Sequence, residues 1–303
     1  MRVLVTGATG FIGSHVVREL LRKGHSVDAL VRPESSRHRL LDVRGVTFWP
    51  VDLSDGATLA ITLGRIRPDG LVHLAWYAEP GAYLRDTARN LASLEDSLRL
   101  LRLVSGGPTR RVVLAGTCLE AGSRPGSGDE PIYAVAKRAL HEVALSGRSG
   151  GMTVACAHVF SVFGPWEDER RAVPSIIRSL LRGDPVDVSA GDQLRDYVHV
   201  ADVAAAFVTI LEHDVGGSID VCTGEARPIG EVFEEIGRAT GRGDLIRRGS
   251  RATGADEGFD AVGDPDPLRS LGWRPREPFP RRMAETVAWW ESVRRARTGS
   301  DAA

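Results

Sequence analysis

Cysteine is scarce in this sequence of 303 residues, and its three positions form no pattern. Cys118, Cys156 and Cys222 are widely separated and give neither a CxxC pair nor, with histidine, a group at zinc-binding spacing. An odd, sparse set also argues against a disulfide framework. We therefore expect a protein of the reducing cytoplasm that has no metal site.

Long apolar runs and a strong charge of either sign are also missing. No apolar run approaches the roughly 18 residues that cross a bilayer. The first residues, MRVLVTGATG, already read as a strand and a glycine turn, so we expect no signal peptide. The formal net charge is −1 and no basic run is present, which disfavours nucleic acids and anionic membranes as partners.

The first half of the chain alternates short apolar runs with longer helical segments. The runs are rich in Val, Leu and Ala without strict alternation, as in strands buried on both faces of a sheet. They cover residues 2–6, 26–31, 46–51, 71–75, 111–116 and 152–159, and the clearest helical segment spans 91–104. Strands separated by helices predict an α/β fold with a Rossmann-type, doubly wound parallel sheet.

A glycine-rich turn joins the first strand to the first helix. Gly7, Gly10 and Gly13 follow a GxxGxxG spacing, one residue longer than the common dinucleotide-binding GxGxxG. Glycines allow positive φ and close backbone approach, and the N–H groups at a helix start attract a pyrophosphate. A glycine turn without a ligand is the alternative, but its place between strand and helix predicts a dinucleotide cofactor.

The end of the second strand bears on which nicotinamide cofactor binds. Val31 stands where an acid would accept hydrogen bonds from a ribose 2′-hydroxyl, and Arg32 follows it. A guanidinium there suits a 2′-phosphate, so we expect NADP(H) to be preferred. NAD(H) is the alternative if Arg32 is a solvated loop residue and Glu34 supplies the acid. Asp52, after the third strand, is placed to meet the adenine, unless it only caps the next helix.

The pattern becomes less regular after Phe163. The predicted segments are a polar loop (164–174), a helix (175–183), a short strand (about 185–189), a strand turning into a helix (196–212), a loop (241–266) and an amphipathic helix (281–297). This change predicts two domains. They are a dinucleotide-binding domain over 1–163, to which residues 196–225 return, and a substrate-binding domain over 164–195 and 226–303.

A tyrosine and a lysine lie four residues apart in PIYAVAK, residues 131–137. On a helix, Tyr133 and Lys137 share one face, and Pro131 suits the first turn. A solvated surface pair is the ordinary interpretation of YxxxK alone. The pair gains meaning beside a cofactor site, which the glycine turn predicts.

Together these motifs resemble the extended short-chain dehydrogenase/reductase family, which contains the NAD(P)-dependent nucleotide-sugar epimerases, dehydratases and ketoreductases. The resemblance covers nearly the whole chain. The motifs are TGATGFIG, LVHLA, the Asn in RNLASLEDSLRLL, LAGTCLEAG, YAVAK, VFSVFGP, QLRDYVHVADVA and LGWRP.

The resemblance implies three catalytic residues. Tyr133 would be the general acid/base, which protonates the carbonyl oxygen in the reducing direction. Lys137 would hold the nicotinamide ribose and favour the phenolate of Tyr133, because a nearby ammonium stabilises the anion. Thr117 matches the family's Ser/Thr, whose hydroxyl holds and orients the substrate oxygen.

The resemblance also implies the binding residues. Those expected to contact the cofactor are Gly7, Thr9, Gly10, Phe11, Ile12, Gly13, Arg32, Asp52, Leu53, Leu74, Ala75, Lys137 and Phe160. Those expected to contact a nucleotide-diphosphate sugar are Trp76, Ser161 and Arg195. The guanidinium of Arg195 suits the diphosphate, with an ion pair to Asp192 or Asp196 as the alternative.

The family pattern also bears on which reaction occurs. Dehydratases carry Asp-Glu after the Ser/Thr, whereas this chain has Cys118 and Leu119, which cannot serve that elimination. The pattern is most like the 4-ketoreductases of deoxysugar pathways, so we expect reduction of an NDP-4-keto-6-deoxyhexose. A 4-epimerase is the nearer alternative, and a non-catalytic NADP-sensing regulator is the more distant one.

Two further expectations follow from the resemblance. Helices at about 82–104 and 131–147 commonly form the dimer interface, so we expect a homodimer. His158 and Ser161 stand where relatives often carry Arg and Asn, which limits how far substrate contacts transfer. His199 and Asp202 are expected to support the turn into the following helix.

Overall fold

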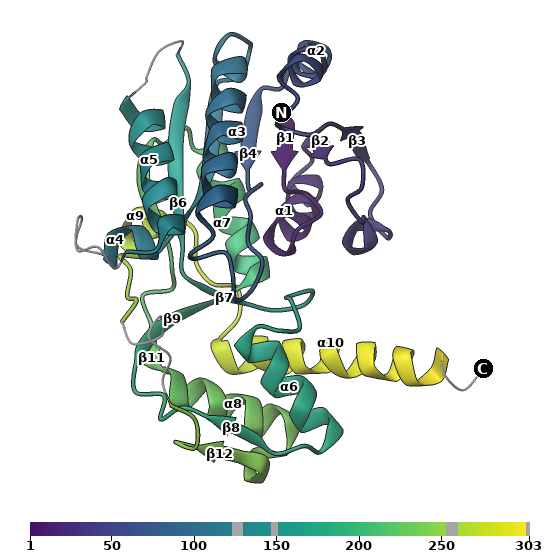
Figure 1. Cartoon of the computed structure of the whole chain (residues 1–303), viewed down its shortest axis with the longest axis vertical. Coiled ribbons are helices and arrows are strands. Elements are labelled where there is room, and N and C mark those ends of the chain that lie inside the picture. The colour runs from purple at the N-terminus through teal and green to yellow at the C-terminus, as the bar shows by residue number, and fades with distance from the viewer. Residues whose placement is uncertain (123–129, 147–150, 253–259, 301–303) are drawn as a thin grey trace. The chain divides into compact units, whose positions relative to one another are not determined.

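The chain folds into two compact units, shown in the computed structural model of Figure 1, which describes residues 1–122, 130–146, 151–252 and 260–300. Unit 1 comprises Met1–Val159, Val203–Val221 and Pro265–Trp273, and unit 2 comprises Phe160–Asp202, Cys222–Asp264 and Arg274–Ala303. The domain limits expected from the sequence stay a prediction, and each unit is described below by itself.

Unit 1 is built on a seven-stranded sheet in the order β10-β6-β5-β4-β1-β2-β3. Every pairing between neighbouring strands is parallel. The strands are β1 (Arg2–Thr6), β2 (Ser26–Val31), β3 (Val46–Pro50), β4 (Gly70–His73), β5 (Arg111–Thr117), β6 (Thr153–Val159) and β10 (Gly217–Val221). The order reverses direction between β1 and β4, as in Rossmann folds, so the predicted fold class is confirmed.

The helices of unit 1 connect and flank these strands. They are α1 (Phe11–Arg22), η1 (His38–Leu40), α2 (Gly56–Ile66), α3 (Thr87–Ser105), α4 (Leu119–Gly122), α5 (Ile132–Ser146), α7 (Val200–Glu212) and α9 (Asp266–Ser270). Most of the apolar runs of the sequence form buried strands, with Val3, Leu4 and Val5 wholly inaccessible, whereas the edge strand β3 has no buried residue. A run that is apolar at every position suits a strand covered on both faces.

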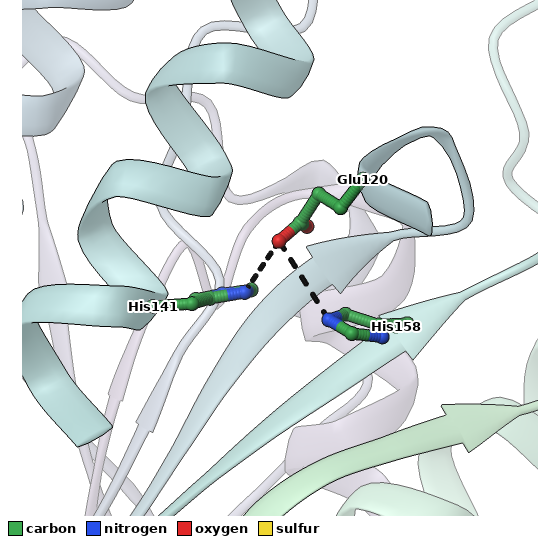
Figure 2. A group of neighbouring side chains, drawn as sticks. All are labelled: Glu120, His141 and His158. Carbon is green, nitrogen blue, oxygen red and sulfur yellow. Dashed lines mark ion pairs between the residues drawn. The ribbon is translucent and has the colours of Figure 1, made fainter. Parts of the chain in front are cut away.

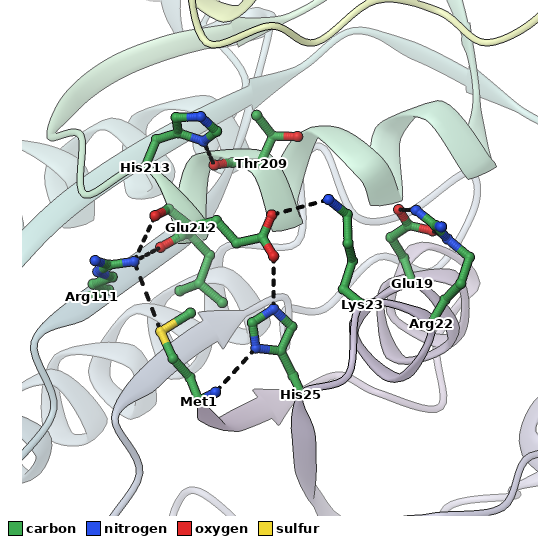
Figure 3. Close-up of polar contacts among 10 residues, drawn as sticks. Met1, Glu19, Arg22, Lys23, His25, Arg111, Thr209, Glu212 and His213 are labelled. Carbon is green, nitrogen blue, oxygen red and sulfur yellow. Dashed lines mark hydrogen bonds and ion pairs between the residues drawn. The ribbon is translucent and has the colours of Figure 1, made fainter.

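The last turn of α7 is fastened to strands and a helix far from it in the sequence (Figure 3). Arg111 Nη1 donates to the carbonyl oxygens of Leu211 and Glu212 at 3.2 and 2.7 Å. A helix end leaves such carbonyls without intrahelical partners. The Glu212 carboxylate also lies 3.0 Å from His25 Nε2 and 3.4 Å from Lys23 Nζ. These contacts fix α7 within unit 1.

Unit 2 has two small sheets and its own apolar core. The strands β7 (Ser161–Phe163), β9 (Leu194–His199) and β11 (Ala226–Pro228) form one sheet, and β8 (Val186–Val188) pairs with β12 (Ile246–Arg248) in the other. The helices are α6 (Ala172–Arg182), α8 (Ile229–Thr240), η2 (Gly243–Leu245) and α10 (Phe279–Ser300). The core includes Phe163, Ile177, Ile236 and Met283, all nearly inaccessible.

The segment predicted as a loop over 241–266 is partly regular. It contains η2 and the three-residue strand β12, which pairs in parallel with β8. A strand this short has no periodicity to detect, and its pairing depends on a segment far away in the sequence. Residues 253–259 of the predicted loop, and residue 147 of the predicted interface helix, lie outside the described residues.

Candidate active site

The glycine turn after β1 has a geometry that only glycine fits. Gly7 has a φ of +68°, and a Cβ added there would lie 2.7 Å from the backbone nitrogen of Ala75. A Cβ on Gly13 would lie 2.0 Å from the Gly7 carbonyl oxygen. Gly10 N–H donates to that same oxygen at 2.9 Å. The turn is therefore packed backbone to backbone against the residues after β4, as a close approach to a pyrophosphate requires.

A buried histidine lies at the end of β4, behind this turn. His73 Nε2 is 2.8 Å from Ser97 Oγ, which donates to the Ser93 carbonyl oxygen at 2.6 Å. Nε2 therefore carries the hydrogen, and Nδ1 accepts from Thr6 Oγ1 at 2.7 Å. Burial lowers the pKa of His73 to about 3. Because Thr6 Oγ1 also accepts from Ala75 N–H at 3.2 Å, the neutral imidazole helps to position the backbone beside the glycine turn.

The end of β2 presents both a cation and an acid. The Arg32 guanidinium and the Glu34 carboxylate are exposed and lie 3.4 Å apart. Val31, at the strand end, is buried. Asp28 is buried in mid-strand, where it accepts from Arg2 Nε and Trp49 Nε1, each at 2.7 Å. Asp28 is thus engaged within unit 1, while Arg32 and Glu34 remain the groups that could meet a ribose.

Asp52 does not cap the helix that follows it. The N-cap of α2 is Asp55, whose carboxylate accepts from Thr58 N–H at 3.1 Å. Asp52 Oδ1 instead accepts from the backbone N–H and the hydroxyl of Ser54, at 2.8 and 2.7 Å. The backbone hydrogen bond from Ser54 is the main reason that the pKa of Asp52 is lowered. The adjacent Leu53 carbonyl oxygen accepts from Arg99 Nη1 at 3.0 Å.

Lys137 is buried inside unit 1, with 3% of its surface exposed. Its Nζ donates to the Ala115 carbonyl oxygen of β5 at 2.6 Å and lies 4.1 Å from the ring centroid of Trp76. The indole N–H of Trp76 donates to Asn90 Oδ1 at 2.9 Å, which fixes the ring. Burial lowers the pKa of Lys137 to about 8, because the ammonium has left water and no carboxylate of the described residues forms an ion pair with it.

Tyr133 lies one turn before Lys137 on α5, as the spacing predicts. The Lys137 Nζ is 6.0 Å from the centroid of the Tyr133 ring. That ring packs edge-on against Tyr83 and Trp76, with centroid separations of 4.9 and 6.3 Å. The Tyr133 N–H donates to the Leu84 carbonyl oxygen at 3.3 Å. The structure therefore brings Trp76, Tyr133 and Lys137 together around one buried ammonium.

Thr117 ends β5, beside a cluster that the sequence analysis missed. Its backbone N–H donates to Glu120 Oε1 at 2.7 Å, and its Oγ1 accepts from Leu119 N–H at 3.4 Å. Figure 2 shows the Glu120 carboxylate between His141 of α5 and His158 of β6. No spacing in the sequence could reveal this group, because its members come from three separate elements.

The site residues assigned to unit 2 lie on or next to the sheet formed by β7, β9 and β11. Ser161 is in β7 opposite Tyr197, and Phe160 precedes it, 8% exposed. Arg195 is 8% exposed in β9, and its Nη1 donates to the Leu194 carbonyl oxygen at 3.1 Å. Their roles in binding cofactor or substrate stay predictions.

Three side chains close to Arg195 in the sequence form hydrogen bonds within the fold, those of Asp196, His199 and Asp202. Asp196 Oδ1 accepts from Thr223 N–H at 2.9 Å, and Oδ2 accepts from Gly224 N–H at 2.7 Å. His199 Nδ1 accepts from Ala201 N–H at 3.3 Å, within the turn into α7. Asp202 accepts from the Arg282 guanidinium at 3.1 Å, which ties the start of α7 to α10.

Comparison with known proteins agrees with this fold and these motifs. A family described as the NAD dependent epimerase/dehydratase family matches residues 3–222. UDP-glucuronate 4-epimerase 1 of Arabidopsis thaliana is 30% identical over 239 residues, covering 69% of this chain and 54% of that protein. The chain thus spans about half the length of that relative.

Two further similarities extend over almost the whole chain. GDP-6-deoxy-D-mannose reductase of Pseudomonas aeruginosa is 25% identical over 313 residues, covering 96% of this chain and 97% of that protein. The crystal structure of the Thermus thermophilus UDP-glucose 4-epimerase in complex with NAD is 28% identical, with a TM-score of 0.82 over 97% of this chain and 100% of that one. The chain belongs to the NAD-dependent epimerase/dehydratase family, whose members act on nucleotide sugars with a nicotinamide cofactor.

Proposed function

We propose that this enzyme reduces the 4-keto group of a nucleotide-linked 6-deoxyhexose with NAD(P)H. The observation that carries the proposal is the buried Lys137 ammonium, held by Ala115 and Trp76 one helical turn from Tyr133. A buried cation without a contacting carboxylate is costly to keep in a fold. Its place beside a tyrosine supports a role in chemistry rather than in stability.

Tyr133 is the proton donor in this proposal. A phenol near neutral pH is a weak acid/base, and a neighbouring ammonium stabilises the phenolate that forms when the proton leaves. Lys137 would stabilise that anion, and Thr117 would hold the substrate oxygen at the end of β5. The reduced nicotinamide supplies the hydride when it is bound. Lys137 also gives its ribose a charged hydrogen-bond donor.

The glycine turn fits the cofactor. The space that a Cβ would fill at Gly7 and Gly13 is backbone-lined. Phe11 and Ile12, after the N-cap Gly10, open helix α1 with their N–H groups at its positive end. Arg32 supports a preference for NADPH, since a guanidinium can pair with a 2′-phosphate. Glu34 lies close enough to compete for that guanidinium, so NADH is the alternative cofactor.

The residues after Thr117 favour reduction over elimination. Cys118 and Leu119 offer no carboxyl group for removing or adding protons at C5 and C6 of a sugar. The P. aeruginosa relative is named a GDP-6-deoxy-D-mannose reductase, which supports a reduction that involves a nucleotide-linked 6-deoxy sugar. Arg195 would bind the diphosphate, Trp76 and Ser161 would contact the sugar, and Phe160 would contact the nicotinamide.

The second candidate function is 4-epimerisation of a nucleotide sugar. Both the Arabidopsis relative and the Thermus structure are 4-epimerases, so the similarities support this activity equally. The same Tyr133, Lys137 and Thr117 would act in both directions of proton transfer at the oxygen on C4, while the nicotinamide would take and return the hydride at C4. A cofactor-sensing regulator would need none of these three groups.

One experiment separates the three functions. Purified protein is mixed with NADPH or NADH and with nucleotide-linked 4-keto-6-deoxyhexoses, and separately with nucleotide hexoses. A reductase consumes reduced cofactor in equal amount to the ketosugar. Interconversion of hexose epimers without net cofactor consumption would replace the reductase proposal by the epimerase, and cofactor binding without turnover on any of them would support the regulator.

A further inference from the structure

We propose that Glu120, His141 and His158 form a binding site for one divalent transition metal, Zn²⁺ being the best match (Figure 2). Two imidazoles and one carboxylate are the donor set of several zinc sites, which leave a further position open. The scattered cysteines and histidines of the sequence predict no metal site, whereas the fold brings these three side chains together. The metal site does not depend on the proposed function.

The three side chains converge on one small volume. One ligand atom from each lies within 4.8 Å of the others. Glu120 Oε2 is 3.6 Å from His158 Nε2 and 2.6 Å from His141 Nδ1. Donors about 2.0–2.2 Å from a zinc ion are roughly 3–4 Å apart. The first separation already fits, and the second needs an opening of about 1 Å by side-chain rotation.

Asp220 orients the imidazole of His158 for such a role. His158 Nδ1 lies 3.2 Å from Asp220 Oδ1, and the two residues are directly paired across β6 and β10. A carboxylate that accepts from Nδ1–H leaves Nε2 with its lone pair, directed at Glu120. This is the arrangement in which a carboxylate fixes the tautomer of a metal-binding histidine.

His141 is buried, and Glu120 is its close polar partner. Only 4% of its surface is exposed. Nδ1 lies 2.6 Å from Glu120 Oε2, but within the described residues neither ring nitrogen meets a hydrogen-bond partner at good geometry. Its ring instead stacks on that of His158, with centroids 5.6 Å apart. A buried polar group in this state is destabilising. A metal ion on Nδ1 would relieve that cost.

Gly116 leaves the space that the side chains of Glu120, His141 and His158 occupy. It pairs with His158 across β5 and β6, and a Cβ added to it would lie 2.6 Å from His141 Cε1 and 2.7 Å from His158 Cδ2. The same Cβ would lie 2.9 Å from Glu120 Oε1. A side chain at this position would therefore press on all three ligands.

The site is coupled to Thr117 through the carboxylate of Glu120. Oε1 accepts from the Thr117 N–H, whereas Oε2 faces the two imidazoles. An ion on Oε2 would fix the carboxylate and with it the backbone at the end of β5. We therefore assign the ion a structural role. Glu120 would connect it to the backbone of Thr117, the proposed catalytic threonine.

The test measures metal binding by the full-length, chelator-stripped protein. Zn²⁺ is titrated in competition with a chromophoric chelator, and Co²⁺ serves as a spectroscopic probe of the ligands. The wild type should bind one ion, with a cobalt spectrum of nitrogen and oxygen ligands. His141→Gln and His158→Gln should each weaken binding at least about tenfold, and Asp220→Asn by about 10–100-fold, the usual effect of removing such a partner.

His213→Ala is the matched control, because this histidine is exposed at the end of α7, and it should bind Zn²⁺ like the wild type. The absence of saturable binding by the wild type would overturn the proposal. Undiminished affinity in His158→Gln would do so as well. Should a variant fail to fold by circular dichroism, the wild-type cobalt spectrum decides, since a thiolate charge-transfer band would place the ion on a cysteine instead.

Discussion

Lys137 in unit 1 and Glu167 in unit 2 are buried ionisable groups whose charges are poorly compensated, and the two groups respond to pH in opposite ways. Lys137 lies in unit 1, and burial lowers its pKa to about 8. Glu167 lies in unit 2, in the segment after β7, and burial raises its pKa to about 8. Removal from water penalises the charged form in both cases, so the lysine is hard to charge and the carboxyl is hard to ionise.

The consequences for stability differ in sign. The unfolded lysine keeps its proton up to its ordinary pKa of 10.5, so its burial costs stability below pH 8 and the cost disappears as the pH rises to 10.5. The unfolded glutamate loses its proton at about 4.5, so its burial costs nothing below pH 4.5 and the full cost is present above pH 8.

The contacts of the two groups distinguish a charge that is buried for function from one whose burial affects only stability. Lys137 has a positioned tyrosine at one turn and a backbone carbonyl that holds it. Glu167 has an Oε2 without a hydrogen bond among the described residues, next to Arg171, whose charge only partly offsets the burial. We expect substitutions at the first to change chemistry and substitutions at the second to change stability.

Tyr133→Phe should give the largest effect. It removes the proton donor and should lower turnover by about 10²-fold or more, the usual contribution of a positioned acid/base. The fold and the cofactor affinity should stay nearly unchanged, as measured by circular dichroism and fluorescence titration. Tyr83→Phe is the matched control, because that ring packs against Tyr133. Wild-type turnover in Tyr133→Phe would remove the tyrosine from the mechanism.

Lys137→Met should impair both turnover and cofactor binding. The ammonium would stabilise the Tyr133 anion and hold the ribose, so we expect at least about a tenfold loss in each, near 1.4 kcal/mol per tenfold. Stopped-flow turnover and cofactor titration measure the two separately. Thr117→Val should fall between wild type and Tyr133→Phe, since it removes only orientation. An unchanged cofactor affinity in Lys137→Met would contradict the ribose contact.

Glu167→Gln should stabilise the protein at high pH and leave turnover unchanged. It removes a buried carboxylate that is ionised above pH 8, which should raise the free energy of unfolding by about 1–3 kcal/mol at pH 9. Well below pH 4.5 the two proteins should be nearly equal, because the carboxyl is then protonated in both the native and the unfolded state. Urea denaturation at both pH values tests this. A gain of the same size at both would show that packing, not charge, is responsible.

Arg32→Asp should reverse the cofactor preference by a modest factor. The guanidinium is exposed, so its contact with a 2′-phosphate should contribute at most about 1 kcal/mol, or about fivefold in affinity. Fluorescence titration of wild type with NADPH and NADH should show tighter NADPH. Arg37→Ala, which removes a cation stacked on Phe48, is the control. Tighter binding of NADH by the wild type would overturn the NADP assignment.

The two units also differ in how many large apolar side chains they expose. Among the described residues, six of the seven large exposed ones lie in unit 1. Leu91 of α3 and Val135 and Val143 of α5 lie on the two helices proposed as the dimer interface. Light scattering should report a homodimer at micromolar concentration, and Val143→Glu should weaken it. Ile61→Glu on α2 is the control, and a monomeric wild type would refute the interface.

Six of the seven strands of unit 1 could be predicted because they are largely apolar runs, and their limits fall within about two residues. Burial on both faces explains this for the inner strands, whereas the edge strand β3 has no buried residue. The short, mixed run of β10 is not among the predicted strands. The glycine turn could be predicted for a similar local reason, since Gly7 needs a positive φ and Gly13 has no room for a side chain. Tyr133 and Lys137 could be paired because one helix fixes their spacing.

The strand β12, the capping role of Asp52 and the partners of Asp196 could not be predicted that way. β12 exists because β8 is beside it, and Asp55 rather than Asp52 caps α2 because the helix begins at Gly56. Asp196 is engaged by Thr223 and Gly224, from a segment distant in the sequence.

The parallel sheet, the glycine turn and the Tyr133–Lys137 pair could be predicted from the sequence, because each rests on local periodicity or on a backbone requirement of a few neighbouring residues. Only the tertiary structure decided the state of the buried charges and the convergence of Glu120, His141 and His158. Desolvation of Lys137 depends on what Trp76 and β5 place around it. The cluster exists because the fold brings α4, α5 and β6 together, and no interval along the chain encodes that proximity.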